Sequence, residues 1–434
     1  MNNLNHKIKC FCVVICLIVV KISAFGQITL SECQKWAFEN YPLIRQYLIN
    51  ERLEQFSVSN AAKAYMPSIT ISGYANHQSS VPEFPEDMEQ IFQNFGMDFK
   101  GLSHDQYRFM LQIDQILWDG GYSKSQKEIE KAKTKAANLS VDKELESIKR
   151  SVNQIYFAIL MMESNIEINN YADTLLHNNL KNVESGISNG TAMQSDLDNI
   201  SVEIMLLEQQ QIKLKSTISL YRKMLSLMVG KEISEFEPVI KPPLPDINRN
   251  ENNRSELKLF DANSDLFTIK EKVINSTVMP HFSVFFQGWY GRPGLNLFND
   301  MQYNEFSWNY IIGIRCQWNT SGFYTKKNNL NKLRAQSQSF QIQKELFLWN
   351  FQIQQSQIES EIFKIKELQE KDDRIVALRQ SIRKTSESKF NNGVITAADL
   401  LRDIINEKNA IIASSMRELE LLKEIYDLKY MLNQ

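Results

Sequence analysis

The chain has 434 residues, a formal net charge of −2, and only 15 glycines and 10 prolines. The nearly balanced charge excludes a general electrostatic field that would attract nucleic acid or an anionic membrane surface. The scarcity of glycine and proline favours long uninterrupted helices over many short elements.

The first 26 residues have the features of an export signal. Two lysines precede an apolar core from Phe11 to Val20, and Ala24-Phe25-Gly26 offers small residues for cleavage. The apolar core is about ten residues long, whereas a helix needs roughly twenty to span a bilayer. We therefore predict a signal peptide at 1–26 and a mature chain that begins at Gln27, with an uncleaved anchor as the alternative.

The start of the mature chain predicts a helix at 30–65, with Ser31 as its N-cap and apolar residues at helical spacing. Met66-Pro67 ends this helix. Residues 69–73 then alternate apolar and polar side chains, which is the period of a strand. Residues 81–103 predict a long loop that contains a short helix at 87–95.

The clearest strand of the first half runs from Tyr107 to Leu117. One of its faces carries apolar side chains, among them Tyr107, Phe109, Leu111 and Ile113. The other face carries polar side chains, namely Gln106, Arg108, Gln112 and Asp114. The polar face indicates contact with water, while the apolar face could rest on an ordinary core or on lipid.

A very long helix follows the turn Trp118-Asp119-Gly120-Gly121, because neither proline nor glycine occurs from Tyr122 to Glu184. At about 1.5 Å per residue such a helix reaches on the order of 100 Å, which is too long for a compact domain. A second helix is predicted from Thr191 to Val229, ending at Gly230. Four prolines between residues 237 and 245 then predict an extended linker.

The second half contains the same predicted elements in the same order. They are a helix at 254–277, strands at 282–287 and 306–317 around a loop at 291–304, and helices at 323–389 and 397–432. The apolar face of the fourth strand is formed by Phe306, Trp308, Tyr310, Ile312 and Ile314. In each half two shorter helices match one long helix in length, so we expect them to lie end to end along it.

A short pattern of Glu-Ser, Asn-Gly and Asp-Leu occurs at 184–197 and again at 387–400, with matched positions 203 residues apart. An internal repeat of this kind indicates a duplicated chain. We therefore divide the mature chain into a first repeat at 27–236, a linker at 237–251 and a second repeat at 252–434.

Several short motifs are informative through their order and spacing. They are Leu30-Ser31-Glu32-Cys33 with Ala37, Glu39-Asn40 and Pro42; Tyr65-Met66-Pro67-Ser68-Ile69; Trp118-Asp119-Gly120-Gly121; and the two Asn-Gly-x5-Asp-Leu turns. With them the sequence resembles the TolC-like family of outer membrane efflux channels over essentially the whole mature chain. The resemblance implies an α+β membrane protein that assembles as a homotrimer. Four strands per chain would contribute to a twelve-stranded transmembrane β-barrel in the outer membrane, and long antiparallel helical hairpins would form an α-barrel in the periplasm.

Such a barrel resolves the ambiguity of the alternating strands. The side chains expected to face outer membrane lipid are Tyr107, Phe109, Leu111, Ile113, Phe306, Trp308, Tyr310 and Ile312, while Arg315 and Gln317 would face a water-filled lumen. Four strands cannot close a barrel, and an open edge in lipid leaves backbone groups unpaired at several kcal/mol each. A trimer is therefore expected on physical grounds as well.

The two Asn-Gly turns have both a structural and a functional interpretation. Structurally they are tight reversals, with glycine in the left-handed conformation and Thr191 or Thr396 capping the next helix. By resemblance they are also the periplasmic tips that meet the helical hairpin of an adaptor protein. The expected contact residues are Asn189, Gly190, Thr191, Asn392, Gly393 and Val394.

Asp399 matches a position at which the family places an acidic ring, and such a ring can select and gate ions. This chain carries Arg402 three residues later and then Asp403, so Arg402 could pair with either aspartate. We expect a pore constriction formed by Asp399, Arg402, Asp403 and Asp196. The alternative is an ordinary solvated helix turn.

The predicted function is the outer membrane channel of a tripartite efflux or type I secretion system. It would be a passive duct that docks to a periplasmic adaptor and an inner membrane transporter, with no enzymatic activity, cofactor, metal or nucleic acid partner. Of the cysteines, Cys33 and Cys316 remain in the mature chain, and we expect small buried side chains rather than a disulfide. The alternative function is a periplasmic coiled-coil scaffold or adaptor, which would have a compact β-rich domain between its helices.

Overall fold

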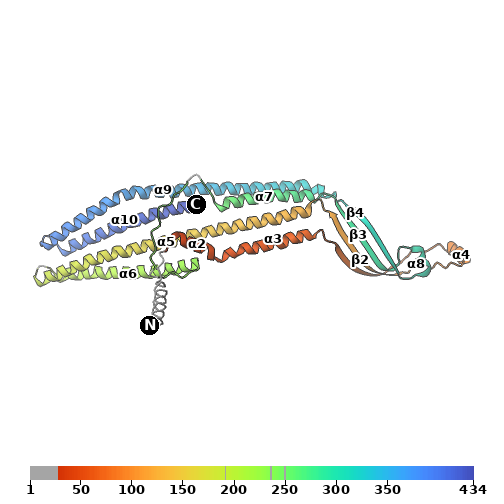
Figure 1. The fold of residues 1–434 in the computed structure, drawn as a ribbon, viewed down its shortest axis with the longest axis horizontal. Coiled ribbons are helices and arrows are strands. Elements are labelled where there is room, and N and C mark those ends of the chain that lie inside the picture. Colours follow the sequence, from red (N-terminus) through yellow and green to blue (C-terminus); the bar gives the residue numbers. More distant parts are fainter. Residues whose placement is uncertain (1–27, 191, 235–236, 249–250) are drawn as a thin grey trace, which may run out of the picture. The chain divides into compact units, whose positions relative to one another are not determined.

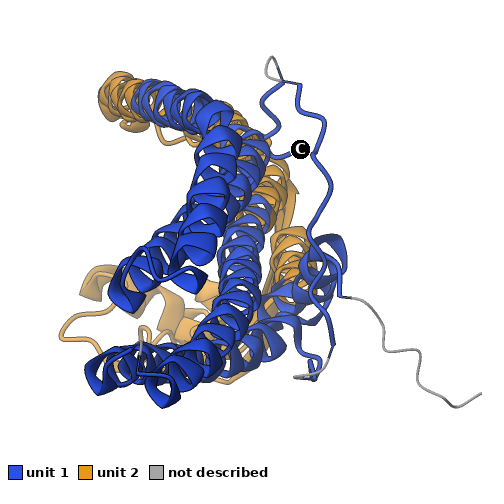
Figure 2. Cartoon of the chain, turned by 90° about the vertical axis from the view of Figure 1, so that its left-hand side faces the viewer, with its two compact units in different colours: residues 1–46, 139–257, 345–434 blue, residues 47–138, 258–344 orange. Residues whose placement is uncertain are grey.

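The structure is a computed structural model that describes residues 28–190, 192–234, 237–248 and 251–434. The predicted signal peptide and the predicted tip residue Thr191 lie outside these ranges. The chain divides into two compact units, each built from segments of both halves (Figure 2). The first unit takes its described residues from Met1–Gln46, Leu139–Leu257 and Glu345–Gln434, and the second consists of Tyr47–Asn138 and Lys258–Lys344.

Helices make up most of the described chain (Figure 1). They are α2 (Leu30–Asn40), α3 (Arg45–Lys63), α4 (Glu86–Asn94), α5 (Tyr122–Ser188), α6 (Gln194–Val229), α7 (Ser255–Ser276), α8 (Leu297–Tyr303), α9 (Gly322–Asn391) and α10 (Ala397–Leu432). The strands are β1 (Ser68–His77), β2 (Asp105–Trp118), β3 (His281–Arg292) and β4 (Ser307–Gln317). The prediction of two very long helices is confirmed, since α5 has 67 residues and α9 has 70.

The prediction of one helix at 30–65 is wrong. The helix ends at Asn40, a 3₁₀ turn follows at Pro42–Ile44, and α3 begins at Arg45. Proline disfavours the helical conformation in the residue before it, and Tyr41 accordingly adopts φ −66° and ψ 130°. The N-cap is Thr29 rather than Ser31: its hydroxyl accepts a hydrogen bond from the Glu32 amide at 3.3 Å.

The loops at the far ends of the strands contain more regular structure than the sequence predicts. The short helix predicted at 87–95 is present as α4. The predicted loop at 291–304 begins inside β3, which continues to Arg292, and it also contains α8. The two loops pack together through Phe84, Phe92, Phe99 and Phe298, whose neighbouring rings lie 5.0–6.1 Å apart.

The four strands form one antiparallel sheet in the order β1-β2-β3-β4. Within this single chain β1 and β4 are the two edges of the sheet. The register pairs Ile71 with Leu111, Leu111 with Gly288, and Gly288 with Tyr310. Since directly opposite residues share a face of the sheet, this register assigns the paired strand residues to one of two faces, with an irregularity between Ile116 and Trp118.

The first unit has a core in which segments distant in sequence meet. One buried cluster joins α5, α6 and α10, and includes Leu176, Ile200, Leu400 and Ile404. Tyr156 and Phe157 of α5 are also fully buried, and the Tyr156 hydroxyl donates to the Ile28 and Ile240 carbonyls at 2.8 and 2.6 Å.

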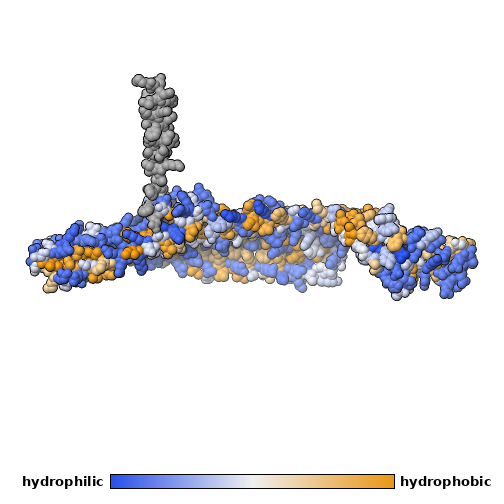
Figure 3. All heavy atoms as spheres, turned by 90° about the horizontal axis from the view of Figure 1, so that it is seen from below, coloured by the Kyte–Doolittle hydropathy of each residue, from blue (hydrophilic) through white to orange (hydrophobic). Residues whose placement is uncertain are grey.

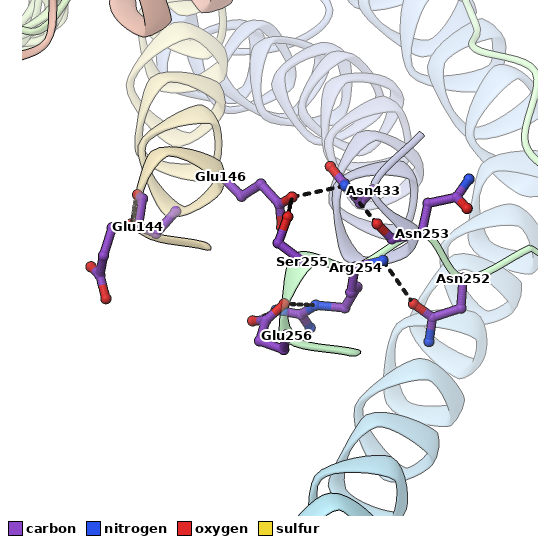
Figure 4. Close-up of polar contacts among 9 residues, drawn as sticks. Glu144, Glu146, Asn252, Asn253, Arg254, Ser255, Glu256 and Asn433 are labelled. Carbon is purple, nitrogen blue, oxygen red and sulfur yellow. Dashed lines mark hydrogen bonds and ion pairs between the residues drawn. The ribbon is translucent and has the colours of Figure 1, made fainter. Parts of the chain in front are cut away.

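The end of α10 and the start of α7 meet beside α5 within the first unit (Figure 4). The Asn253 amide donates to the Leu432 carbonyl at 3.0 Å, and the Asn433 side chain donates to the Asn253 carbonyl at 2.9 Å. Glu146 of α5 accepts hydrogen bonds from Ser255 and, at 2.8 Å, from Asn433. These contacts fix the junction of two shorter helices against the long one.

The two cysteines are both free. Cys33 is buried, as expected, but Cys316 is exposed on β4, so the expectation of burial is wrong for the second one. The reason is its place opposite Phe282, on a strand face that no described segment covers.

Candidate functional site

One face of the sheet is apolar and exposed. Ile113, Phe286 and Ile312 are successive cross-strand partners, as are Phe109, Tyr290 and Trp308. The register therefore places on this face all of the predicted lipid-facing residues that belong to strands: Tyr107, Phe109, Leu111, Ile113, Trp308, Tyr310 and Ile312. Phe306 precedes β4, and its ring stacks on Tyr290 at 5.6 Å. Trp308 is 81% exposed and Ile312 66%, so no described part of the chain covers this face; hydrophobic residues gather over the strands in Figure 3.

Aromatic side chains gather at both ends of the apolar face. At the end next to the loops lie Tyr107, Tyr290, Phe306 and Trp308, with Tyr290 and Trp308 rings 5.0 Å apart. At the opposite end Trp118 lies 5.9 Å from Phe282, and Trp318 donates to the Val278 carbonyl at 3.0 Å. Between the two groups lie mainly aliphatic residues, namely Ile71, Leu111, Ile113, Val284, Ile312 and Ile314, together with the rings of Phe286 and Tyr310, which are 6.4 Å apart.

The opposite face of the sheet is polar, and its side chains contact one another across strands. Arg315 of β4 forms an ion pair with Asp114 of β2 at 3.2 Å. Gln287 donates to Gln112, also at 3.2 Å. The residues predicted to face water thus lie on the face opposite the predicted lipid-facing set.

The two Asn-Gly turns lie beside one another in the first unit and line one groove with a volume of about 850 Å³. The residues that contribute are Asn182, Ser185, Gly186, Asn189, Ala192, Met193, Asp196, Phe390, Asn391, Asn392, Gly393, Val394, Ile395, Thr396, Ala397 and Asp399. Gly190 and Gly393 have φ of 74° and 69°, the left-handed conformation predicted for both. The structure therefore brings together two turns that are 203 residues apart in sequence.

The four predicted constriction residues do not form a single cluster. Asp399 is the third residue of α10 and completes its N-terminal cap: it accepts from the Thr396 hydroxyl at 2.8 Å and from Arg402 at 3.2 Å. Asp403 instead accepts from Ser386 of α9 at 2.7 Å. Asp196 accepts from the Met193 amide at 3.1 Å. Arg402 therefore pairs with Asp399 rather than with Asp403.

The charge of Asp399 is stabilised by its surroundings. The hydrogen bond from the Thr396 side chain, followed by the Thr396 backbone amide and the nearby Arg402 guanidinium, holds the pKa of this carboxyl below its usual range. Both Asp399 and Arg402 are exposed, with 40% and 69% of their side chains accessible. Asp399 is therefore a solvent-accessible group at the tip that is negatively charged at neutral pH.

A buried polar cluster that the sequence analysis missed lies near these residues. Arg383 of α9 forms an ion pair with Glu407 of α10, whose side chain has no exposure, and a second with Glu387 at 2.7 Å. The Tyr171 hydroxyl of α5 donates to Glu407 at 3.4 Å. Burial, followed by the charge of Glu407, raises the pKa of Tyr171. The sequence does contain a sign of this cluster. Leu400, Ile404 and Ile411 form an apolar seam on the last helix, and Glu407 lies on that seam where an apolar core residue is expected.

Membrane-spanning helices and metal-binding clusters are both absent from the part of the chain that the structure describes. None of its helices is both long enough and apolar enough to cross a bilayer. Nor do those residues include a group of three or more His, Cys, Asp or Glu side chains arranged to hold a metal ion.

Comparison of the sequence with models of protein families and with curated proteins finds no match. Comparison of the structure with solved structures finds several outer membrane channels. The outer-membrane channel OprN is 14% identical, with a TM-score of 0.69 over 93% of this chain and 89% of that one. VceC from Vibrio cholerae is 14% identical, with a TM-score of 0.67 over 93% and 94%.

A third similar structure is the open state of the MtrE outer membrane channel from Neisseria gonorrhoeae. It is 14% identical, with a TM-score of 0.64 over 93% of this chain and 88% of that one. The resemblance inferred from the sequence is confirmed at the level of the fold: the chain has the fold of the TolC-like outer membrane efflux channels.

Proposed function

We propose that this protein is the outer membrane channel of a tripartite efflux or type I secretion system. It acts as a passive export duct that docks to a periplasmic adaptor and receives substrate from an inner membrane transporter, with no catalytic step of its own. The observation that carries this proposal is the four-stranded sheet, whose apolar face and two edges are left uncovered by the residues that the structure describes. OprN and MtrE are outer membrane channels and VceC is an outer membrane protein, and the shared fold supports the same role here.

The apolar face is suited to lipid. Side chains as exposed as Trp308 and Ile312 are unfavourable in water but stable in a hydrocarbon layer. Aromatic groups at both ends of a continuous apolar band, which here also includes Phe286 and Tyr310, are the arrangement expected of a transmembrane barrel, where aromatic girdles lie at the two interfaces. Strands of 10 to 14 residues are long enough to cross the bilayer when tilted.

The open edges require further strands. In a bilayer each unpaired backbone group at the edge of β1 or β4 costs several kcal/mol, so the sheet has to close on itself. Three copies of four strands make a twelve-stranded barrel, and we propose a homotrimer in which β1 of one copy pairs with β4 of the next. The polar face, with Arg315 and Asp114, then lines the lumen.

The helices supply the periplasmic part of the proposed duct. By length α5 and α9 each extend on the order of 100 Å, far beyond the thickness of a membrane. We propose that they form an α-barrel in which 27–236 and 252–434 are two repeats joined by a linker at 237–251. The segment 1–26 is proposed as the signal that directs export toward the outer membrane.

The groove between the two turns is the proposed adaptor site, with Asn189, Gly190, Asn392, Gly393 and Val394 exposed there and Thr191 as the remaining predicted contact. The proposed constriction uses Asp399, Arg402, Asp403 and Asp196. Because Arg402 partly neutralises Asp399, the ring carries less negative charge than aspartate alone would give it. We propose that the Asp399 and Arg402 pair sets the ion preference of the closed tip.

The assembly state tests the proposed function. We expect the mature protein in the outer membrane fraction, as a trimer that runs as one band without heating and as a monomer after heating. The periplasmic scaffold or adaptor alternative requires a compact β domain, whereas the sheet leaves its apolar face uncovered. A soluble monomer that is extracted without detergent would contradict the channel and favour that alternative.

A further inference from the structure

On the polar face of the sheet, one cation has no carboxylate partner among the described residues. Among the strand residues of this face, the charged side chains are Arg108, Asp114 and Arg315. Asp114 and Arg315 neutralise each other at 3.2 Å. Within the described chain the Arg108 side chain forms neither a hydrogen bond nor an ion pair, whereas its backbone is paired in the sheet. Arg108 is half-buried and none of its nitrogens is closed off from solvent, so its guanidinium is open to an anion that comes from outside the chain.

Arg108 is held in place by an aromatic ring. Its guanidinium carbon lies 5.0 Å from the centre of the Trp289 ring, a distance typical of a cation–π contact. Trp289 is only 4% exposed, and its indole nitrogen has no hydrogen-bond partner among the described residues. This contact orients Arg108 without using its hydrogen-bonding nitrogens, which stay available to an anion.

A cavity of about 610 Å³ lies beside Arg108, between β1 and β2. Its lining includes the side chains Tyr74, Asn76, Gln78, Gln106 and Met110, and no carboxylate. Arg292 also borders it, although its guanidinium lies over the rings of Tyr107 and Phe306. A cavity of this size matches a drug-sized molecule. Its chemistry combines one fixed cation, several amide and phenol hydrogen-bond donors, and aromatic and thioether surface.

We propose that Arg108 and this cavity form a binding site for an organic anion that carries an aromatic ring, such as an aromatic sulfonate or carboxylate. The guanidinium donates two hydrogen bonds to the oxyanion, and Tyr74 and Met110 contact the ring. The proposal deepens the proposed function, because it places a preference for anionic aromatic substrates on the lumenal face of the barrel.

The test is binding of naphthalene-2-sulfonate to the full-length protein in a non-ionic detergent, measured by titration calorimetry. We expect saturable binding that is stronger than for 2-naphthylmethylammonium, a cation of similar size. Arg108→Gln should weaken binding of the sulfonate about tenfold or more, because a hydrogen-bonded ionic contact is lost. Arg108→Lys should restore part of the affinity. The matched control is Arg315→Gln, which removes an equal charge from the same face where Asp114 already neutralises it.

Absence of saturable binding, equal binding of the anion and the cation, or the same loss for Arg315→Gln as for Arg108→Gln would overturn the proposal. Circular dichroism of each variant separates loss of the site from loss of the fold. Binding in detergent does not depend on channel activity, so a soluble or non-conducting protein that still binds the sulfonate would contradict the proposed function and leave the site supported.

Discussion

Arg383 of α9 and Glu407 of α10 form an ion pair in which the carboxylate is completely buried and the arginine side chain is 9% exposed. Removal of one partner from a buried pair leaves an uncompensated charge in a medium of low polarity. We therefore predict that Glu407→Ala lowers the free energy of unfolding by about 3–5 kcal/mol. Chemical denaturation of the detergent-solubilised protein, followed by circular dichroism, measures this change.

The control for the buried pair is Arg402→Ala, which breaks an exposed ion pair on the same helix and should have a much smaller effect. The double variant Arg383→Met with Glu407→Leu should be more stable than Glu407→Ala, because it leaves no buried charge. If Glu407→Ala and Arg402→Ala lowered the free energy of unfolding by the same amount, the prediction for the buried pair would be wrong.

Neighbouring residues of β1 test which face of the sheet meets lipid. Ile71 lies on the apolar face opposite Leu111, and Thr70 lies on the polar face opposite Gln112. An arginine on the lipid side of a barrel costs about 2–4 kcal/mol at the middle of the bilayer, whereas one in the lumen remains hydrated. We expect Ile71→Arg to reduce the amount of trimer in the outer membrane fraction strongly and Thr70→Arg to reduce it little. The opposite order of the two variants would mean that the faces are assigned the wrong way round.

The Asp399 and Arg402 pair should determine the ion preference of the tip. We predict that Asp399→Ala weakens cation preference and Arg402→Ala strengthens it, as measured by the reversal potential of single channels in a salt gradient. Because its surroundings hold the pKa of Asp399 below the usual carboxyl range, the preference should persist as the pH falls from about 7 to about 4. If both variants keep the conductance and selectivity of the wild-type protein, this pair is not the gate.

Glu146 should make stability depend on pH. Burial raises the pKa of this carboxyl in the folded protein, against the effect of the hydrogen bond from Ser255. A raised pKa means that the folded state binds the proton more tightly. The resulting stabilisation is complete below the pKa of the unfolded chain and is lost as the pH rises through the pKa of the folded state.

Glu146→Gln removes the charge but keeps an acceptor for Ser255 and Asn433, so its stability relative to the wild type should increase as the pH rises from about 4 to about 7. Thermal unfolding at several pH values gives this difference. Glu144→Gln, which removes an exposed carboxylate two residues away, is the control (Figure 4). A constant difference between the Glu146→Gln and wild-type proteins over this range would contradict the prediction.

Local features of the sequence predicted most of the elements. The alternation in β2 and β4, the long stretches without proline or glycine, and the turns at Gly190 and Gly393 depend on residues within a few positions of one another. The wrong prediction at 30–65 also has a local cause. Pro42 interrupts the helix, although apolar residues recur at helical spacing on both sides of it.

The candidate sites depended much more on tertiary structure. The sequence identified the two tip turns, but only the packing of α5, α6 and α10 places them along one groove. From the sequence Arg402 could pair with either Asp399 or Asp403. In the structure Asp403 accepts from Ser386 on α9, and Arg402 pairs with Asp399. The sequence places Glu407 on an apolar seam of the last helix, but it does not identify Arg383 as the partner of Glu407.

The sequence by itself determined most of the helical and extended segments and the alternation within the strands, because these properties arise from backbone sterics and side-chain periodicity over a few residues. Only the tertiary structure decided the register that unites four apolar strand faces, the burial of Glu407 against Arg383, and the unpaired state of Arg108 beside Trp289. Each of these is a contact between segments far apart along the chain, and its geometry is set by the packing of whole helices and strands rather than by neighbouring residues.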